Sequence, residues 1–271
     1  MNDKKPKIGI ALGGGGARGV AHAGVLKALD NAGINIDLIV GTSMGAMVGA
    51  CYALDMSFSD IEKLFIGYNR TKLFRKLFDI SNPRKSLIKG KKAKKYLEEL
   101  FAGKQFSDTK IPFYIIATNL ADGSEVVMKE GQIAEAVRAS ISVPGIFPPV
   151  EWNNTYLIDG GVVNPTPVDK VKEFGADIII GVDLMSKRNI TITKAPTVID
   201  TLLQSYEIIR TQAVNYNVGK VNGSAIMIKP ETGAVSGSFN FSNMEAFCEL
   251  GVKAAEERIP EIKKRIAEFK G

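Results

Sequence analysis

The sequence predicts an α/β fold of three layers, with a mostly parallel central sheet and helices on both of its faces. Short apolar runs typical of buried strands alternate with longer helical patterns along the chain. No internal repeat and no low-complexity linker interrupts this alternation. The 271 residues suit one large domain with a sizeable core, so we expect a single domain over residues 1–271.

The first half of the chain supplies two strand–helix units, a lysine-rich helix and a hairpin. Two short apolar strands each lead through a glycine-containing turn into a helical segment. Ser57 is expected to cap the next helix, with Asp60 at its third position. Asp122-Gly123 between two apolar runs is a hairpin signal. The expected strands are 7–12, 36–40, 111–120 and 125–128, and the expected helices are 20–29, 46–54, one from 57, 91–101 and 133–140.

The second half of the chain begins with an apolar loop and continues the alternation of strands and helices. Three prolines within 143–150 exclude regular structure there, so this segment is expected to lie as an ordered loop near the site. Residues 196–221 predict one long helix or two. Ser242 is expected to cap the last helix, which Pro260 kinks or divides. The expected strands are 156–158, 176–184 and 225–229, and the expected helices are 196–221 and 242–270.

A Gly-x-Ser-x-Gly motif, Gly41-Thr42-Ser43-Met44-Gly45, joins an expected strand to an expected helix. This context is typical of a nucleophile elbow, in which a strained turn exposes the serine at a helix N-terminus. Gly41 and Gly45 would permit the tight turn and the close approach of helix and strand. The alternative interpretation is a tight glycine turn that carries an incidental serine.

Four consecutive glycines, 13–16, lie between the first expected strand and helix. Their N–H groups can bind an anion, and two functions compete for them. A dinucleotide site would need an acid at the end of the next strand, whereas Asp37 lies at its start. We therefore favour an oxyanion hole, in which the N–H groups of Gly14, Gly15 and Gly16 face Ser43.

Asp159-Gly160-Gly161 ends an apolar strand, and Asp159 is the best candidate for the base that Ser43 needs. The single histidine, His22, precedes the serine, so the chain cannot form a triad in the α/β-hydrolase order. His22 is expected to be a core or hydrogen-bonding residue. A Ser43–Asp159 dyad is the simplest arrangement, although a carboxylate with an ordinary pKa of about 4 is a weak base.

Metal, cofactor and membrane-spanning functions find no support in the composition. One histidine and two separated cysteines provide no ligand set, and no cofactor is expected. Cys51 and Cys248 lie in apolar helical contexts and are expected to be free, buried thiols, which fits the cytoplasm. There is no apolar run of about 18 residues, and the N-terminal residues read as a first strand and not as a signal peptide.

The positive charge is concentrated in residues 70–95, which hold eleven Lys/Arg and one acid. This segment therefore carries a charge of +10 and the rest of the chain a charge of −4, which gives the net charge of +6. A solvated helical face is one interpretation, and a cap over the site at about 70–101 that also rests on anionic lipid is another. No nucleic-acid motif is present, so no nucleic-acid partner is expected.

Three motifs in this order resemble those of the patatin-like phospholipases, in particular the bacterial members. They are the glycine-rich turn at 14–19, the elbow at 41–45 and the Asp-Gly-Gly motif at 159–161. The segment from 139 to 149 and Asn164-Pro165 are also similar to stretches of that family. The resemblance covers residues 7–184, and the C-terminal third is less diagnostic.

The resemblance implies an esterase, a lipid acyl hydrolase that acts on phospholipid or lysophospholipid esters without calcium. It implies Ser43 as nucleophile, Asp159 as general base and the glycine turn as oxyanion hole. It implies that Arg18 supports that turn or binds the substrate phosphate. Apart from the resemblance, the free thiols and the basic segment predict a cytoplasmic protein with peripheral membrane contact.

Two other functions stay open at this point. A similar serine elbow occurs in acyltransferases of the malonyl-transferase type, where His22 would have to serve as the base. The second alternative is a non-catalytic, membrane-associated regulator that keeps the fold. The intact Ser43, Asp159 and glycine turn speak against a pure scaffold.

Overall fold

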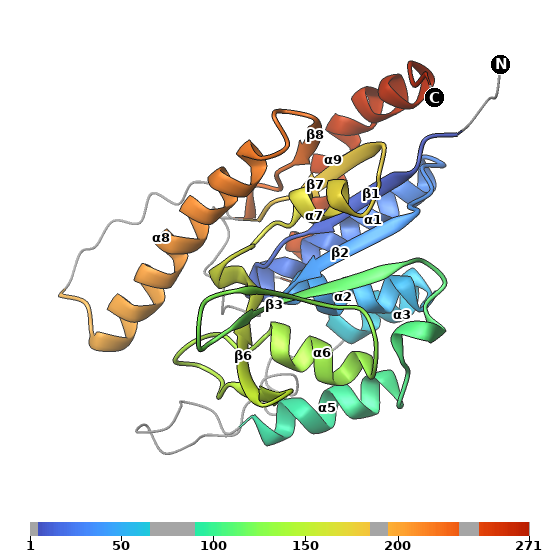
Figure 1. Ribbon diagram of the computed structural model, residues 1–271. Coiled ribbons are helices and arrows are strands. Elements are labelled where there is room, and N and C mark those ends of the chain that lie inside the picture. The colour runs from blue at the N-terminus through green and yellow to red at the C-terminus, as the bar shows by residue number, and fades with distance from the viewer. Residues whose placement is uncertain (1–4, 66–89, 185–194, 233–243, 271) are drawn as a thin grey trace.

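A mixed sheet forms the centre of the molecule in the computed structural model, which describes residues 5–65, 90–184, 195–232 and 244–270 (Figure 1). Its strands are β1 (Ile8–Leu12), β2 (Leu38–Thr42), β3 (Phe113–Asn119), β4 (Glu125–Met128), β5 (Val150–Trp152), β6 (Thr155–Asp159), β7 (Ile178–Val182) and β8 (Ala225–Ile228). The helices are α1 (Ala21–Asn31), α2 (Met44–Ala53), α3 (Phe58–Phe65), α5 (Lys91–Phe101), α6 (Ile133–Ser140), α7 (Val168–Glu173), α8 (Val198–Gly219) and α9 (Met244–Ala267). Short 3-10 turns lie at Gly16–Val20, Phe106–Asp108 and Gly160–Val162.

The order of strands in the sheet is β5-β6-β3-β2-β1-β7-β8, and β4 pairs with β3. The five strands from β3 to β8 in this order are parallel to one another. In contrast, β6 runs antiparallel to β3, and its last residue, Asp159, pairs with Ala117. Because Thr42 at the end of β2 pairs with Ile116, β2 and β6 end at the same level on either side of β3.

Alternate side chains of the central strands enter two different hydrophobic cores. In β1, Ile8, Ile10 and Leu12 join the larger core, which α1, α2, α6 and α9 complete, whereas Ala11 joins a smaller one. Helix α7 and Val221 close the smaller core on the other face of the sheet. This period of two is the pattern of a sheet that is covered on both faces, and it gives three layers. The predicted fold class is therefore confirmed.

Most of the expected elements form within a few residues of their expected bounds, and the helices at 91–101 and 133–140 form as expected. The N–H of Asp60 donates to Ser57 Oγ at 3.1 Å, so Ser57 caps this helix as expected. Residues 196–221 give one long helix, α8, which Figure 1 shows along one side of the molecule. Pro260 lies inside α9 without dividing it.

Strand β5, and the hairpin that it forms with β6, have no counterpart among the expected elements. Asn153 and Asn154, with φ of 45° and 63°, form the turn of a hairpin between β5 and β6. Asparagine tolerates this left-handed conformation, which two-residue hairpin turns require. The expectations for the basic residues 70–89 and for Ser242 lie outside the described residues.

Candidate active site

Ser43 lies in the sharp turn between β2 and α2, where its φ of 55° and ψ of −123° are strained for a residue with a side chain. Such a conformation costs about 1–3 kcal/mol and is typical of a nucleophile elbow. Both flanking glycines have a steric reason. A Cβ at Gly41 would lie 2.6 Å from the Ala46 Cα, and one at Gly45 would overlap the Leu12 carbonyl oxygen.

A second serine holds the backbone of the elbow. The N–H of Ser43 donates to Ser140 Oγ at 2.8 Å, and that hydroxyl donates to the Ile116 carbonyl at 2.7 Å. Ser140 is the last residue of α6 and is fully buried. It therefore satisfies an N–H that the strained turn leaves without a helical partner. The sequence motifs did not indicate this role.

Asp159 faces the serine from the end of β6. Ser43 Oγ donates to Asp159 Oδ2 at 2.6 Å, and the Gly161 N–H donates to Asp159 Oδ1 at 2.7 Å. A Cβ at Gly160 would overlap the Ile116 carbonyl oxygen of β3, so the chain must be glycine where it bends past the sheet. The two residues expected to form a dyad thus lie in hydrogen-bond contact across β3.

Burial makes Asp159 a stronger base than an ordinary aspartate. Its side chain is 1% exposed, and loss of water raises the pKa of the carboxyl group. The positive charge of Arg210 and the hydrogen bonds from Ser43 and Gly161 act in the opposite direction and are weaker than the effect of burial. A raised pKa makes the carboxylate better suited to accept a proton from a hydroxyl.

The glycine turn lies next to the serine, but its amides are not equivalent. The N–H groups of Gly13 and Gly14 donate to the carbonyls of Val182 and Pro165, at 3.1 and 2.9 Å. Within the described residues, the N–H groups of Gly15 and Gly16 donate to no acceptor. Of the three expected oxyanion donors, Gly14 differs from the other two because the backbone already uses its amide in this structure. Gly15 and Gly16 remain candidates.

His22 forms a hydrogen bond with the backbone of this turn. It is fully buried on α1, and its Nε2 lies 2.6 Å from the Gly13 carbonyl oxygen. Because a carbonyl only accepts, Nε2 carries the proton. Burial lowers the pKa of His22 to about 4, so the ring is neutral near pH 7. These contacts agree with the hydrogen-bonding role expected for His22 and do not favour a base for an acyltransferase.

Arg18 connects the glycine turn to the C-terminal part of the chain. Its side chain is fully buried, and its Nε donates to the Gly15 carbonyl at 3.3 Å. Its Nη2 forms an ion pair with Glu207 of α8 at 3.4 Å. Two roles were expected for Arg18, and these contacts correspond to the first, which is to support the glycine turn.

The sequence motifs missed the wall of the site that α8 contributes. Tyr206 and Arg210 are both buried, and the guanidinium of Arg210 lies 5.1 Å from the centre of the Tyr206 ring. A Cβ added at Gly161 would lie 2.9 Å from Arg210 Nε and 3.0 Å from the Tyr206 hydroxyl. Arg210 lies three residues after Glu207 and four after Tyr206, so each of these pairs lies on one side of a helix, but no motif marked that side as facing Ser43.

A sequence model described as patatin-like phospholipase matches residues 10–172, which include the glycine turn, the elbow and Asp159. This match covers more than half of the chain. The chain belongs to the patatin-like phospholipase family.

Several curated patatin-like relatives have similar sequences. Lysophospholipase nte1 of Aspergillus fumigatus is 37% identical over 187 residues, or 66% of this chain and 12% of that protein. Patatin-like phospholipase domain-containing protein 6 of Homo sapiens is 34% identical over 184 residues, or 66% of this chain and 13% of that protein. The match thus spans about an eighth of the length of these relatives.

The structure of VipD from Legionella pneumophila has a similar fold. It superposes with a TM-score of 0.62 and covers 95% of this chain and 67% of that one, at 16% sequence identity. At this low identity, the likeness concerns the fold alone. Because it covers 95% of this chain, this likeness of fold includes most of the residues that follow the matched residues 10–172.

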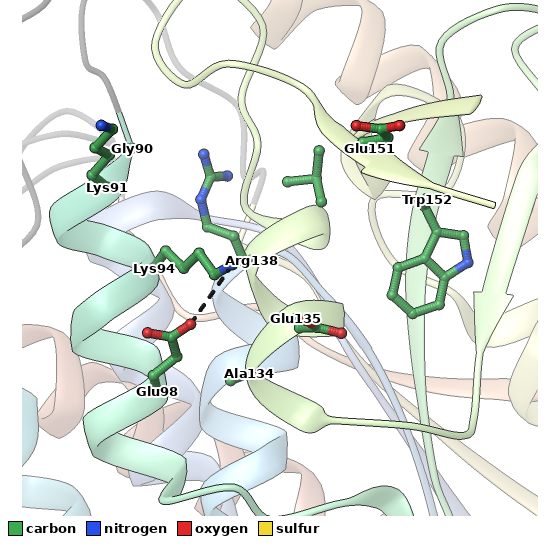
Figure 2. Close-up of a pocket in the computed structure, with 10 residues that line it drawn as sticks. Gly90, Lys91, Lys94, Glu98, Ala134, Glu135, Arg138, Glu151 and Trp152 are labelled. Carbon is green, nitrogen blue, oxygen red and sulfur yellow. Dashed lines mark ion pairs between the residues drawn. The ribbon is translucent and has the colours of Figure 1, made fainter. Parts of the chain in front are cut away.

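A pocket of 340 Å³ lies elsewhere in this patatin-like chain, between α5, α6 and β5 (Figure 2). Its lining includes Lys91, Lys94, Arg138 and Trp152, but neither Ser43 nor Asp159. In Figure 2, Lys94 reaches toward Glu98 on its own helix, and the two form an ion pair at 3.7 Å. Ser43 itself is only 6% exposed. The dyad is therefore covered in this structure.

Metal sites and membrane-spanning helices are both absent from the described ranges of this patatin-like chain. These ranges contain no group of three His, Cys, Asp or Glu side chains that could hold a metal ion. None of their helices combines the length and the apolar character needed to cross a bilayer. Cys51 and Cys248 are free and buried, as expected.

Proposed function

We propose that this chain hydrolyses carboxylic ester bonds of phospholipids or lysophospholipids through a Ser43–Asp159 dyad and an acyl-enzyme. The observation that carries the proposal is the 2.6 Å hydrogen bond from Ser43 Oγ to Asp159 Oδ2. It occurs at a serine held in a strained turn, beside glycine amides. The names of the relatives, which are lysophospholipases and a patatin-like phospholipase protein, support the lipid substrate.

In the first half of the reaction, Asp159 accepts the proton of Ser43 as Oγ attacks the ester carbonyl carbon. The N–H of Gly161 holds the carboxylate in the orientation that receives this proton. The carbonyl oxygen becomes an oxyanion and binds the N–H groups of Gly15 and Gly16. The loss of one such donor costs about 2.7–4 kcal/mol in typical hydrolases.

In the second half, the alcohol leaves with the proton from Asp159, and the acyl group stays on Ser43 Oγ. Asp159 then takes a proton from water, whose oxygen attacks the acyl carbon. Collapse of this second oxyanion releases the fatty acid, and the proton returns to Ser43. No histidine takes part, and the raised pKa of Asp159 partly compensates for its absence.

The test is a fluorophosphonate probe followed by mass spectrometry. One adduct on Ser43 is expected in the parent protein and none in Ser43→Ala. Ser205→Ala, which changes an exposed serine of α8, serves as the matched control and is expected to react normally. Fatty-acid release from lysophosphatidylcholine should follow the same order and persist in EDTA. Absence of an adduct on the folded parent protein would contradict the proposal.

We also propose that the basic residues 70–95, within a cap at about 70–101, contact an anionic membrane surface from the cytoplasmic side. Residues 70–89 lie outside the described part, and the contribution that can be described is one exposed side of α5. It presents the lysines Lys91, Lys92, Lys94 and Lys95. Helix α5 itself packs on α6 through a buried apolar side.

Co-sedimentation with vesicles tests this contact. Binding to vesicles that contain anionic phospholipid is expected to weaken as salt rises from about 0.05 to 0.5 M, because salt screens exposed charges. Zwitterionic vesicles should bind less protein at every salt concentration. Equal binding to both kinds of vesicle, or binding to neither, would contradict an electrostatic contact.

A further inference from the structure

Arg210 is a buried cation with donors that lack acceptors. It is 4% exposed, and among the described residues neither its Nε nor its Nη2 has a hydrogen-bond partner. Its Nη1 lies 3.6 Å from Glu207 Oε1. Buried guanidinium donors are normally paired, because an unsatisfied buried donor is costly. The arrangement therefore indicates a place for an acceptor that the chain itself does not supply.

The two donors without acceptors lie in front of the dyad. A Cβ built on Gly14 would lie 2.5 Å from Arg210 Nη2 and 3.3 Å from the Ser43 Cβ. A Cβ built on Gly161 would lie 2.9 Å from Arg210 Nε and 2.9 Å from Asp159 Oδ1. The guanidinium thus extends from the glycine turn to the glycines after Asp159, within a few ångström of the nucleophile.

The neighbours of Arg210 in the described part of the chain hold it in place but leave its Nε and Nη2 without acceptors. Glu207 is shared between Arg210 and Arg18, and Asp159 already accepts hydrogen bonds from Ser43 and Gly161. Beyond the opposing effect of burial, the charges of the neighbouring Tyr206, Glu207, Asp159 and Asp183 raise the pKa of Arg210, which keeps it charged. The ring of Tyr206 lies beside the guanidinium and fixes its orientation.

We propose that Arg210 binds the phosphate of the lipid substrate through Nε and Nη2 while Ser43 attacks the ester. The inference rests on the proposed function and adds a residue that selects phosphate-bearing esters. Two N–H groups of a planar guanidinium match two phosphate oxygens in a bidentate contact. Only the glycerol unit separates ester and phosphate in a lysophospholipid, which suits the closeness of Arg210 to Ser43.

Arg18 connects the glycine turn to α8, because its Nε donates to the Gly15 carbonyl and its Nη2 pairs with Glu207. The alternative roles of Arg210 are to hold Asp159 in its ionised form or to bind the oxyanion. Both would help every ester equally, whatever its headgroup. A comparison of two substrates that differ only in the phosphate therefore distinguishes recognition of phosphate from support of the chemistry.

The test compares lysophosphatidylcholine with a monoacylglycerol of the same acyl chain, both in the same detergent micelles. In Arg210→Lys and Arg210→Met, the ratio of kcat/KM for the phosphate-bearing substrate to that for the neutral one is expected to fall roughly ten- to hundredfold. The change should lie mainly in KM, and lysine should lose less than methionine. Arg258→Met, which alters a half-exposed arginine of α9, is the control and should keep the parent ratio.

A second measurement uses the parent protein and does not depend on how the variants fold. Glycerophosphocholine should compete with the monoacylglycerol and raise its apparent KM. An unchanged substrate ratio in folded Arg210 variants, or an equal loss for both substrates, would overturn the inference. Failure of the proposed function is distinguishable, since it appears as no fluorophosphonate adduct on Ser43 in the parent protein.

Discussion

His22 should make the stability of the protein depend on pH in a way that one variant can remove. The folded protein holds the pKa of His22 at about 4, whereas an unfolded chain restores it to 6.5. Between these values the unfolded chain binds more protons, so the free energy of unfolding rises with pH. The stability that neutral His22 provides is therefore complete above pH 6.5 and is lost as pH falls toward 4.

The magnitude follows from the two pKa values. A difference of about 2.5 between 6.5 and 4, at 1.36 kcal/mol for each tenfold change in proton affinity, gives about 3 kcal/mol. This is a large part of the 5–15 kcal/mol that stabilises a typical domain. His22→Gln should abolish the dependence, because a glutamine amide can still donate to the Gly13 carbonyl but does not titrate.

Urea unfolding of both proteins at a series of pH values from 4 to 8 measures the effect. The parent protein should lose about 3 kcal/mol relative to His22→Gln across this range. Parallel curves for the two proteins would refute the lowered pKa. The same variant tests the acyltransferase function. Complete loss of the fluorophosphonate adduct on Ser43 in folded His22→Gln would identify His22 as the base.

Three further perturbations test the elbow and the dyad. Asp159→Asn should lower kcat by at least about 10² while the protein stays folded, and near-normal turnover of the variant would exclude the dyad. In the parent protein, kcat should fall as the pH drops through a pKa above the ordinary value of about 3.9, because protonated Asp159 cannot act as a base. Gly45→Ala should lower the free energy of unfolding by about 1–3 kcal/mol in urea, because the new methyl overlaps a β1 carbonyl, whereas Gly219→Ala, with open space around it, should be neutral or stabilising. Ser140→Ala should cost about 1–3 kcal/mol in the same assay by leaving the N–H of the nucleophile without an acceptor, and an unchanged midpoint would mean that another group replaces the hydroxyl.

The motif-bearing parts of the site could be predicted from the sequence because their chemistry depends on local constraints. The elbow needs glycine at 41 and 45 for steric reasons that a short motif records. Asp159 became the candidate base because the only histidine precedes the serine. The structure adds that β6 runs antiparallel to β3 and so ends at the level of Ser43.

The remaining parts of the site depend on contacts between distant segments, which no local pattern encodes. Ser140 was not expected to bond the Ser43 amide, since 97 residues separate the two. No local pattern indicated that the amide of Gly14 has an acceptor, because that acceptor, the Pro165 carbonyl, comes from a distant loop. Arg210 carried no signal, because an arginine in a helix is usually solvated and only the docking of α8 buries it.

The position of α8 has a consequence for how such a protein can diverge. The residues that we assign to bond-breaking all lie within the stretch that the family shares, which ends at residue 172, whereas Tyr206 and Arg210 lie beyond it. Exchange of one helix would therefore alter which headgroup is accepted without disturbing the elbow or its carboxylate. Grafting α8 from a relative with another headgroup preference is thus expected to change the selectivity. Sequence changes in this helix would give enzymes that differ in selectivity and keep identical chemistry.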